Sequence, residues 1–340
     1  MSDMLPDLSV LIVSWNVREH VRECIASIAA DAARPHTEVI LVDNASADGT
    51  APAIRQEFPW VRVVENAENH GFPAANNQAL ALARGRHVLF LNPDTVVRPG
   101  TLAACVRALD ADPDLGAVGC RIEFPDGRVQ YEGGRSRYRF RHLVYEVLYL
   151  HMLFPRSRIF AEHVMGDWDH RGVRNVDALS GAFMMVPHRV ALEVGGLPDD
   201  VFMYHEDLSF CMRIGRSGRT LLYRGDVSIV HYGGSSSRRS PARLTLLEVE
   251  AKQRFIRDGD GPVWAALARS VFLLRSLVRL AVCTVGSALP RSFRERYPRV
   301  FDWRTHALQL AWSVSPALTA GLMPRSGPRP PLRALHEGAP

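Results

Sequence analysis

The chain has 340 residues, of which 47% are hydrophobic and 23% charged, so it has the composition of a globular protein with one or two domains. Its formal net charge is +5, but 40 of its 41 basic residues are arginines, a bias that we attribute to genomic base composition, and we therefore expect no nucleic-acid partner. Its five separated cysteines contain no Cys-x-x-Cys pair, which argues against a zinc site or a disulfide framework and favours the reducing cytoplasm.

The first 120 residues alternate between short apolar runs and segments with helical spacing. The expected strands are 8–14, 38–42, 61–64, 87–91 and 117–121, and the expected helices are 17–30, 50–58, 73–83 and 99–110. The run Leu8–Val13 follows Asp3 and Asp7 and is too short for a signal peptide. This alternation predicts an α/β fold with a mostly parallel sheet flanked by helices. Neither a G-x-G-x-x-G sequence nor a Walker A sequence is present, which argues against a dinucleotide-dependent dehydrogenase and a P-loop enzyme.

Polar side chains follow three of these expected strands. Ser14 ends the first and Asn16 follows it, Asp43 directly follows the second, and Asn92 and Asp94 follow the strand 87–91. Because open α/β sheets bind ligands beyond the carboxyl ends of their strands, these residues predict a site at one sheet edge. Both acidic segments could instead be ordinary turns that precede helices.

The middle of the chain is less regular. Residues 123–175 are rich in Arg, His and Tyr and have no firm assignment; they could cover the site or meet a partner. The segments expected after them are a strand, turn and strand over 176–187 around Ser180 and Gly181, helices 187–193 and 206–217, and strands 220–223 and 227–231.

The last hundred residues change in character. A charged amphipathic helix is expected over 243–258, and the apolar segment 263–289 carries three arginines within an arc of roughly 120°. This predicts a helix in the membrane interface with its arginines toward anionic head groups, although packing on the main domain is the alternative. Residues 307–322 are apolar but broken by Pro316, and the Pro-rich segment 324–340 is expected to be disordered. The predicted division is therefore a domain over 1–240, a helical extension over 241–323 and a tail.

Several segments occur together in one order. They are Val13-Ser14-Trp15-Asn16, Val42-Asp43-Asn44-Ala45-Ser46, Asn69-His70-Gly71-Phe72, Leu91-Asn92-Pro93-Asp94 and Tyr204-His205-Glu206-Asp207. As a set they resemble the family 2 glycosyltransferases of the GT-A fold, and within them the rhamnosyltransferase-like branch, over roughly residues 8–240.

The resemblance implies a divalent metal, Mg²⁺ or Mn²⁺, which would neutralise the diphosphate leaving group. Asp94 matches the metal-binding carboxylate, while Asn92 stands where the family usually has a first aspartate. His231 matches a later position that completes the metal shell in some relatives, although it could equally be a structural histidine at the end of a strand.

The same resemblance implies roles for the remaining polar residues. Asp43 would bind the N3–H of uracil or thymine. The other residues expected to contact the donor are Ser14, Asn16, Asn69, Gly71, Asn76, Asn92, Ser180 and Gly181. Asn76 could instead be a solvated helix residue.

Asp207 matches the catalytic base, with Glu206 as its neighbour, although a Glu-Asp pair also suits the start of any helix. Ser209 stands where relatives often carry another aspartate.

The expected activity is an inverting, metal-dependent sugar transfer from a UDP-sugar or a dTDP-sugar, with dTDP-rhamnose as the best single donor. The expected acceptor is a lipid-linked or cell-surface saccharide at the cytoplasmic face of the membrane, where the product would enter cell-wall or surface polysaccharide. Two alternatives remain open. A degenerate, non-catalytic scaffold is favoured by Asn92 and Ser209, and a nucleotidyltransferase would normally need a lysine-containing phosphate loop near the N-terminus that this sequence lacks.

Overall fold

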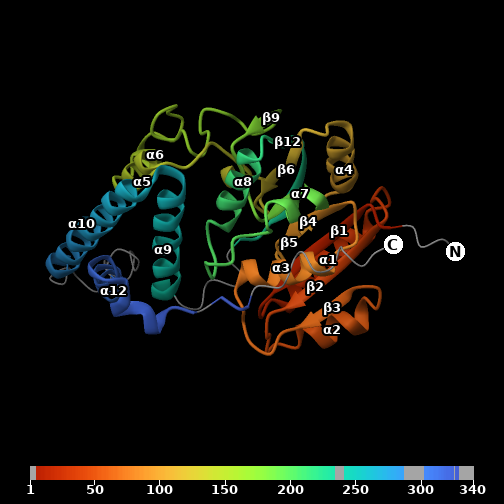
Figure 1. Ribbon diagram of the computed structural model, residues 1–340, viewed down its shortest axis with the longest axis horizontal. Coiled ribbons are helices and arrows are strands. Elements are labelled where there is room, and N and C mark those ends of the chain that lie inside the picture. The colour runs from red at the N-terminus through yellow and green to blue at the C-terminus, as the bar shows by residue number, and fades with distance from the viewer. Residues whose placement is uncertain (1–4, 234–240, 287–301, 325, 329–340) are drawn as a thin grey trace.

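The computed structural model describes residues 5–233, 241–286, 302–324 and 326–328 (Figure 1). Ten of its strands form one mixed sheet, whose order is β3-β2-β1-β4-β11-β6-β12-β5, with β7 beside β6 and β9 beside β12. These strands are β1 (Leu8–Ser14), β2 (Thr37–Asp43), β3 (Arg62–Glu65), β4 (His87–Leu91), β5 (Thr95–Val97), β6 (Leu115–Glu123), β7 (Val129–Gln130), β9 (Val173–Val176), β11 (Phe183–Pro187) and β12 (Thr220–His231). A separate pair joins β8 (Gly134–Arg135) to β10 (Ala178–Leu179).

Helices cover both faces of this sheet and extend beyond one end of it. Those around the sheet are α1 (Arg18–Ala30), α2 (Thr50–Glu57), α3 (Phe72–Leu82), α4 (Thr101–Ala111), α7 (His188–Glu193) and α8 (Glu206–Arg216). Those at the far end are α5 (Phe140–Val147), α6 (Leu150–Leu153), α9 (Pro241–Asp260), α10 (Pro262–Gly286) and α12 (Trp303–Val314). The short 3₁₀ segments are η1 (Tyr131–Gly133) and η2 (Pro316–Leu322).

The parallel half of the sheet gathers the strand ends that bear the polar residues. Strands β3, β2, β1 and β4 are mutually parallel, and Ser14 lies directly opposite Asp43 in the register of β1 and β2. Strand β11 then runs antiparallel to β4. The polar residues after β1, β2 and β4 therefore share one edge, as the sequence predicts.

Burial on both faces explains why these strands are continuous apolar runs. Leu11 and Val13 of β1 pack in the core on one side of the sheet, whereas Val10 and Ile12 pack in the core on the other. Helix α1 covers the second side with its buried stripe of Val21, Cys24, Ile25 and Ile28. The positions of the strands at the ligand edge are thus set by packing on two sides.

The structure differs from the expected elements in three places. Residues 220–223 and 227–231 belong to one strand, β12, whose register against β6 shifts between Arg224 and Ser228. The short strand β5, directly after Asp94, was not expected and pairs with the end of β12. The unassigned stretch 123–175 contains β7, β8, β9, α5 and α6. Because each of these strands has only two to four residues, periodicity could not reveal them.

The C-terminal helices pack together and do not direct their arginines as expected. Arg269 donates to the Ser313 and Val314 carbonyls, at 2.7 and 2.8 Å, and so caps the end of α12. Arg275 is largely buried, and Arg279 donates to the hydroxyl of Tyr149. Among the described helices, none is long and apolar enough to cross a membrane. Residues 287–289 of the predicted interfacial helix lie outside the described residues.

The break at Pro316 is present, since α12 ends at Val314 and η2 begins at Pro316. Beyond it, the expected disorder does not apply to Ser326 and Gly327. The Ser326 hydroxyl donates to the Val201 carbonyl at 2.8 Å, and the Gly327 N–H donates to the His70 carbonyl at 2.9 Å. The other residues of the predicted tail, except 324 and 328, lie outside the described part of the chain.

Candidate active site

A buried carboxylate occupies the end of β2. Asp43 is 3% exposed, and its Oδ1 accepts hydrogen bonds from the Ser14 hydroxyl, at 3.0 Å, and from the Ser46 hydroxyl. Its other oxygen, Oδ2, accepts no hydrogen bond from the described residues. Since two hydroxyl donors hold the side chain in one orientation, Oδ2 is a fixed acceptor of the kind that a base N–H requires.

Asn16 orders the loop above this carboxylate. Its Oδ1 accepts from the Ala47 N–H at 2.8 Å, and its own N–H donates to the Ser46 hydroxyl at 2.9 Å. Asn16 has a φ of 55°, a left-handed conformation that asparagine tolerates better than most residues. The loops after β1 and β2 are therefore bonded to each other at the sheet edge.

A second asparagine, Asn44, ties in the segment that was expected to close over the nucleotide. Its Nδ2 donates to Asn69 Oδ1 at 2.8 Å, and its Oδ1 accepts from Asn66 Nδ2 and the His70 N–H at 3.0 and 3.1 Å. The Asn69 side chain also accepts from the Gly71 N–H at 2.9 Å. Asn69 therefore shapes the loop, and the sequence analysis did not assign Asn44 a role.

Gly71 is required at its position for two reasons. Its φ is 86°, and a Cβ added there would lie 2.7 Å from the Phe202 carbonyl oxygen. That carbonyl accepts from the Phe72 N–H at 2.9 Å. The close approach joins the asparagine-rich loop to the segment that leads into Glu206 and Asp207.

Asn76 is a buried residue of α3, which excludes the alternative that it is a solvated helix residue. It is 1% exposed; its Nδ2 donates to the Phe72 carbonyl at 3.0 Å, and its Oδ1 has no partner among the described residues. A buried acceptor without a donor is costly unless a ligand or water supplies one.

Asn92, Asp94 and His231 lie together where β4 ends and β12 ends. His231 Nε2 lies 3.3 Å from Asp94 Oδ1 and 3.3 Å from Asn92 Nδ2. The other imidazole nitrogen, Nδ1, lies 3.0 Å from Gln130 Oε1, so Gln130 orients the ring. The sequence did not identify Gln130, because no motif surrounds it.

The chemistry of this donor set fits a hard or borderline divalent cation, provided that other oxygens complete the shell. One carboxylate, one imidazole and the amide of Asn92 converge here. Within the described residues no group of three or more His, Cys, Asp or Glu side chains could hold a metal. The protein would therefore supply a minority of the ligands, and phosphate and water oxygens the rest.

Asp207 lies beside the turn that contains Gly181. Its Oδ2 accepts from Arg135 at 2.7 Å and from the Gly181 N–H at 3.2 Å, and its Oδ1 accepts from the Leu208 N–H at 2.8 Å. The Ser180 hydroxyl accepts from the Ala182 N–H at 3.2 Å and so shapes this turn. Arg135 comes from β8, in the stretch without an assignment, so sequence reasoning missed it.

The two halves of the site are connected through the backbone. The Asn92 N–H donates to the carbonyl of Ala182 at 3.1 Å, directly after the Gly181 that binds Asp207. The end of β4, which leads into Asp94, and the predicted base Asp207 are therefore held by the same turn. Ser14 and Asp43 belong to the neighbouring parallel strands at this edge.

Glu206 has a different environment from Asp207. It is buried, and its Oε2 has no partner among the described residues. Desolvation first, and then repulsion from Asp207, raise the pKa of Glu206 to about 8. This raised pKa favours the protonated form of the Glu206 carboxyl at neutral pH, so of the two adjacent acids Asp207 suits the role of base better.

The raised pKa of Glu206 predicts how the stability of the protein depends on pH. Between pH 4.5, the ordinary pKa, and about 8 the folded state binds more protons at this group than the unfolded state, so stability from this group falls as pH rises. We expect the Glu206→Gln variant to lose this contribution, so that its stability falls less steeply than that of the wild type as pH rises through the window. Urea unfolding at pH 5 and pH 8 gives the free energy of unfolding of the wild type and the variant at each pH. If the difference between the two pH values were the same in both proteins, the assignment to Glu206 would be contradicted.

The segment before Glu206 is strained and well packed. Tyr204 and His205 have φ values of 77° and 58°, which such side chains rarely adopt. The His205 ring lies against Tyr138 and Phe255, with centroids 5.9 and 6.0 Å away. Strain of this kind persists only where surrounding contacts fix it, and here it turns the chain so that α8 begins at Glu206.

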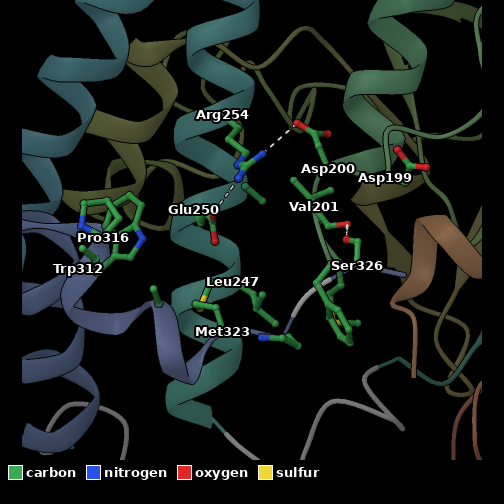
Figure 2. Close-up of a pocket in the computed structure, with 16 residues that line it drawn as sticks. Asp199, Asp200, Val201, Leu247, Glu250, Arg254, Trp312, Pro316, Met323 and Ser326 are labelled. Carbon is green, nitrogen blue, oxygen red and sulfur yellow. Dashed lines mark hydrogen bonds and ion pairs between the residues drawn. The ribbon is translucent and has the colours of Figure 1, made fainter. Parts of the chain in front are cut away.

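A cavity of about 410 Å³ lies on the other side of this segment (Figure 2). It separates residues 199–203 from α9, α12 and η2, and the Arg254 side chain of α9 reaches Asp200 at 3.0 Å and Glu250 at 3.0 Å. Ser326 closes the cavity through its bond to Val201. The C-terminal region thus contacts the loop before the base, and Gly327 contacts the loop of His70.

Comparison with known proteins bears on what this site is. Residues 9–167 match the sequence model of the family described as "Glycosyl transferase family 2". The chain is 29% identical over 307 residues to the N-acetylglucosaminyl-diphospho-decaprenol L-rhamnosyltransferase of Mycobacterium tuberculosis, a match that covers 87% of this chain and 97% of that protein. It is also 23% identical to the rhamnosyltransferase WbbL of Escherichia coli, over 67% of this chain and 84% of that protein.

Solved structures show the same arrangement of elements at low identity. The mannosyltransferase PcManGT from Pyrobaculum calidifontis, in complex with GDP-Man and Mn²⁺, aligns with a TM-score of 0.54 and 20% identity, over 91% of this chain and 88% of that one. Residues 1–349 of TarS from S. aureus, in complex with UDP-GlcNAc, align with a TM-score of 0.50 and 16% identity, over 92% and 83%. At these identities the likeness concerns the fold.

Proposed function

Because the chain belongs to the family 2 glycosyltransferases, which are inverting, and has the GT-A fold, we propose that it transfers a sugar from a pyrimidine nucleoside diphosphate to a hydroxyl of a lipid-linked saccharide. One observation carries the proposal. Asp43 and Asp94 lie beyond the ends of β2 and β4, which both pair with β1, and Asp207 of α8 bonds to the Gly181 turn that also holds Asn92. In this proposal Asp43 contacts the nucleobase of the donor, Asp94 binds the cation and Asp207 takes the proton of the acceptor.

The proposed specificity for the nucleobase of the donor rests on Oδ2 of Asp43, which accepts no hydrogen bond from the described residues. An ionised carboxylate accepts hydrogen bonds and donates none, so Oδ2 suits the N3–H of uracil or thymine. Cytosine carries an unprotonated N3 and cannot donate there. We therefore propose a UDP-sugar or a dTDP-sugar as the donor.

The proposed sugar is rhamnose, from dTDP-rhamnose. Support comes from two relatives that are named rhamnosyltransferases, one of which matches nearly along its full length. The name of that relative also describes a decaprenol-linked N-acetylglucosamine, which supports a lipid-linked acceptor for this chain. Such an acceptor would place the enzyme at the cytoplasmic face of the membrane.

We propose that Asp207 takes the proton of the acceptor hydroxyl while the oxygen of that hydroxyl attacks the anomeric carbon. The new C–O bond forms on the face opposite the diphosphate, the bond to the diphosphate breaks, and the configuration inverts. Arg135 and the Gly181 N–H hold the carboxylate of Asp207 in position for this step.

Asp94 and His231, with Asn92, would hold Mg²⁺ or Mn²⁺, which when bound neutralises charge on the departing diphosphate. Asn76 Oδ1, a buried acceptor, and the loop of Asn69 and Gly71 would border the nucleotide.

A thermal-shift screen of nucleoside diphosphates with and without Mn²⁺ tests the proposed donor class. A ligand that binds only the folded state at 100 times its Kd adds about 2.7 kcal/mol to stability, which is easily measured. We expect a Mn²⁺-dependent rise in melting temperature with UDP or dTDP and none with CDP, ADP or GDP. An absence of any shift would favour the non-catalytic scaffold instead.

A further inference from the structure

The outer side of α10 is exposed and carries no charged side chain. Its exposed large apolar residues run from Val263 to Val285 and span an arc of about 140° on the helix, while Phe272 and Ser276 on the opposite side are buried. Leu274, at the centre of this arc, is 63% exposed. An exposed apolar stripe of this length is unusual on a protein surface and marks an interaction surface.

A second exposed apolar segment lies beside it. Residues 148–159, which include α6, expose Met152, Leu153 and Phe154. Phe140 of α5 packs on Trp264, with ring centroids 5.1 Å apart, and Arg279 of α10 donates to Tyr149. Figure 1 shows α5, α6 and α10 together at the end of the molecule away from β1, β2 and β3. We call the exposed apolar side chains of 148–159 and 263–285 the apolar face.

The charges in these two segments are of one sign. Residues 148–160 and 262–286 contain five arginines and neither aspartate nor glutamate. Arg156 and Arg158 are exposed two and four residues after Phe154, and Arg158 pairs with Asp167 at 3.1 Å. Tyr149, Trp264 and Trp303 are exposed there or on the neighbouring α12, and amphipathic aromatic rings are enriched at membrane interfaces.

We propose that the apolar face docks on the surface of an anionic lipid bilayer. A second copy of the chain fits less well, because a two-fold contact would bring the exposed Arg156 of each copy toward the same residue of the other, and residues 148–160 and 262–286 contain no acid to pair with it. Anionic head groups complement the exposed Arg156 and Arg158, and the acyl boundary takes up the apolar side chains. The biological purpose of this docking rests on the proposed function. The docking surface would meet the bilayer that holds the lipid-linked acceptor.

Cosedimentation with vesicles of phosphatidylglycerol and phosphatidylcholine tests the proposal. We expect the wild-type protein to bind them, and the double variant Leu274→Glu, Val278→Glu to partition at least tenfold more weakly. The matched control is Trp60→Glu, Val173→Glu, which places the same charges on exposed apolar residues of other elements and should bind as the wild type does. Equal binding by the α10 variant and the control would overturn the proposal.

Two further measurements keep the result unambiguous. Vesicles with brominated acyl chains should quench the tryptophan fluorescence of the wild type, and the double variant Trp264→Phe, Trp303→Phe should abolish that quenching. If the quenching persisted in the double variant, the proposed orientation on the bilayer would be contradicted.

Light scattering without lipid should show that the protein is a monomer. A dimer that the variant Leu274→Glu, Val278→Glu dissociates would instead identify a second copy as the occupant of the apolar face. Because the vesicles contain neither donor nor acceptor, failure here leaves the nucleotide screen as a separate test of the proposed function.

Discussion

Replacement of Asp207 by Asn is expected to abolish sugar transfer while leaving donor binding nearly intact. The amide has the shape of the carboxylate, and its single oxygen can still accept from Arg135 and the Gly181 N–H, so the turn beside the donor should keep its form; only the bond from the Leu208 N–H is lost. It cannot take the acceptor proton. Loss of a general base costs about 10² to 10⁴ in rate, and we expect an effect in this range on kcat.

Two measurements separate this role from a structural one. Calorimetry with the donor nucleotide should give a similar affinity for the wild type and Asp207→Asn, and the transfer rate should differ by at least a hundredfold. Asp200→Asn is the matched control, since Asp200 belongs to the same segment but pairs with Arg254 on the far side of it. A variant at Asp207 that keeps a tenth of the activity, or one that loses donor binding, would contradict its assignment as the base.

The ends of the parallel strands were predictable because one physical rule governs them. A run buried on both faces is mostly apolar, so a cluster of polar residues at its carboxyl end marks the ligand edge. This rule places Ser14, Asp43 and Asn92 at one edge, as the structure confirms. The adjoining turns follow from local chemistry, such as the glycine at position 71 with its positive φ.

The partners of these residues were not predictable in the same way. Arg135 reaches Asp207 from 72 positions earlier in the chain, and Gln130 reaches His231 across 101 positions. Both come from strands of two residues, which have no periodicity to detect. The protonated state of Glu206 likewise depends on burial that only tertiary packing creates. Sequence patterns thus predicted the residues proposed to contact the substrates, and the structure supplies the groups that orient them.

The helical spacing of the α10 arginines correctly predicted that they share one side of a helix, but the predicted direction of that side was wrong. Their spacing on one arc predicted contact with head groups, yet Arg269 caps α12 and Arg275 is buried. The helix has a protein-facing side that carries these arginines and an outer side that is apolar. Periodicity identifies two faces, but it does not say which of them the rest of the chain covers.

Replacement of Asp94 by Ala is expected to remove the dependence of donor binding on Mn²⁺. Asp94 is the carboxylate of the two predicted metal residues, and a hard cation depends on a charged oxygen ligand more than on the imidazole of His231. His231 would remain oriented by Gln130, so the loss should reflect the carboxylate itself. We expect the Kd of the donor in Mn²⁺ to rise at least tenfold, which is about 1.4 kcal/mol, and transfer to fall by about 10² or more.

The measurement is a titration with Mn²⁺ at a fixed concentration of UDP or dTDP. The melting temperatures of the wild type and the variant are recorded at each Mn²⁺ concentration. Asp126→Ala is the control, because Asp126 is an exposed carboxylate that pairs with Arg128 in a turn outside the site. His231→Ala should give a smaller effect of the same kind, since it leaves the carboxylate in place. If Asp94→Ala kept the wild-type response to Mn²⁺, the cation would have to be bound elsewhere, and the strand edge would retain only its roles in base recognition and proton transfer.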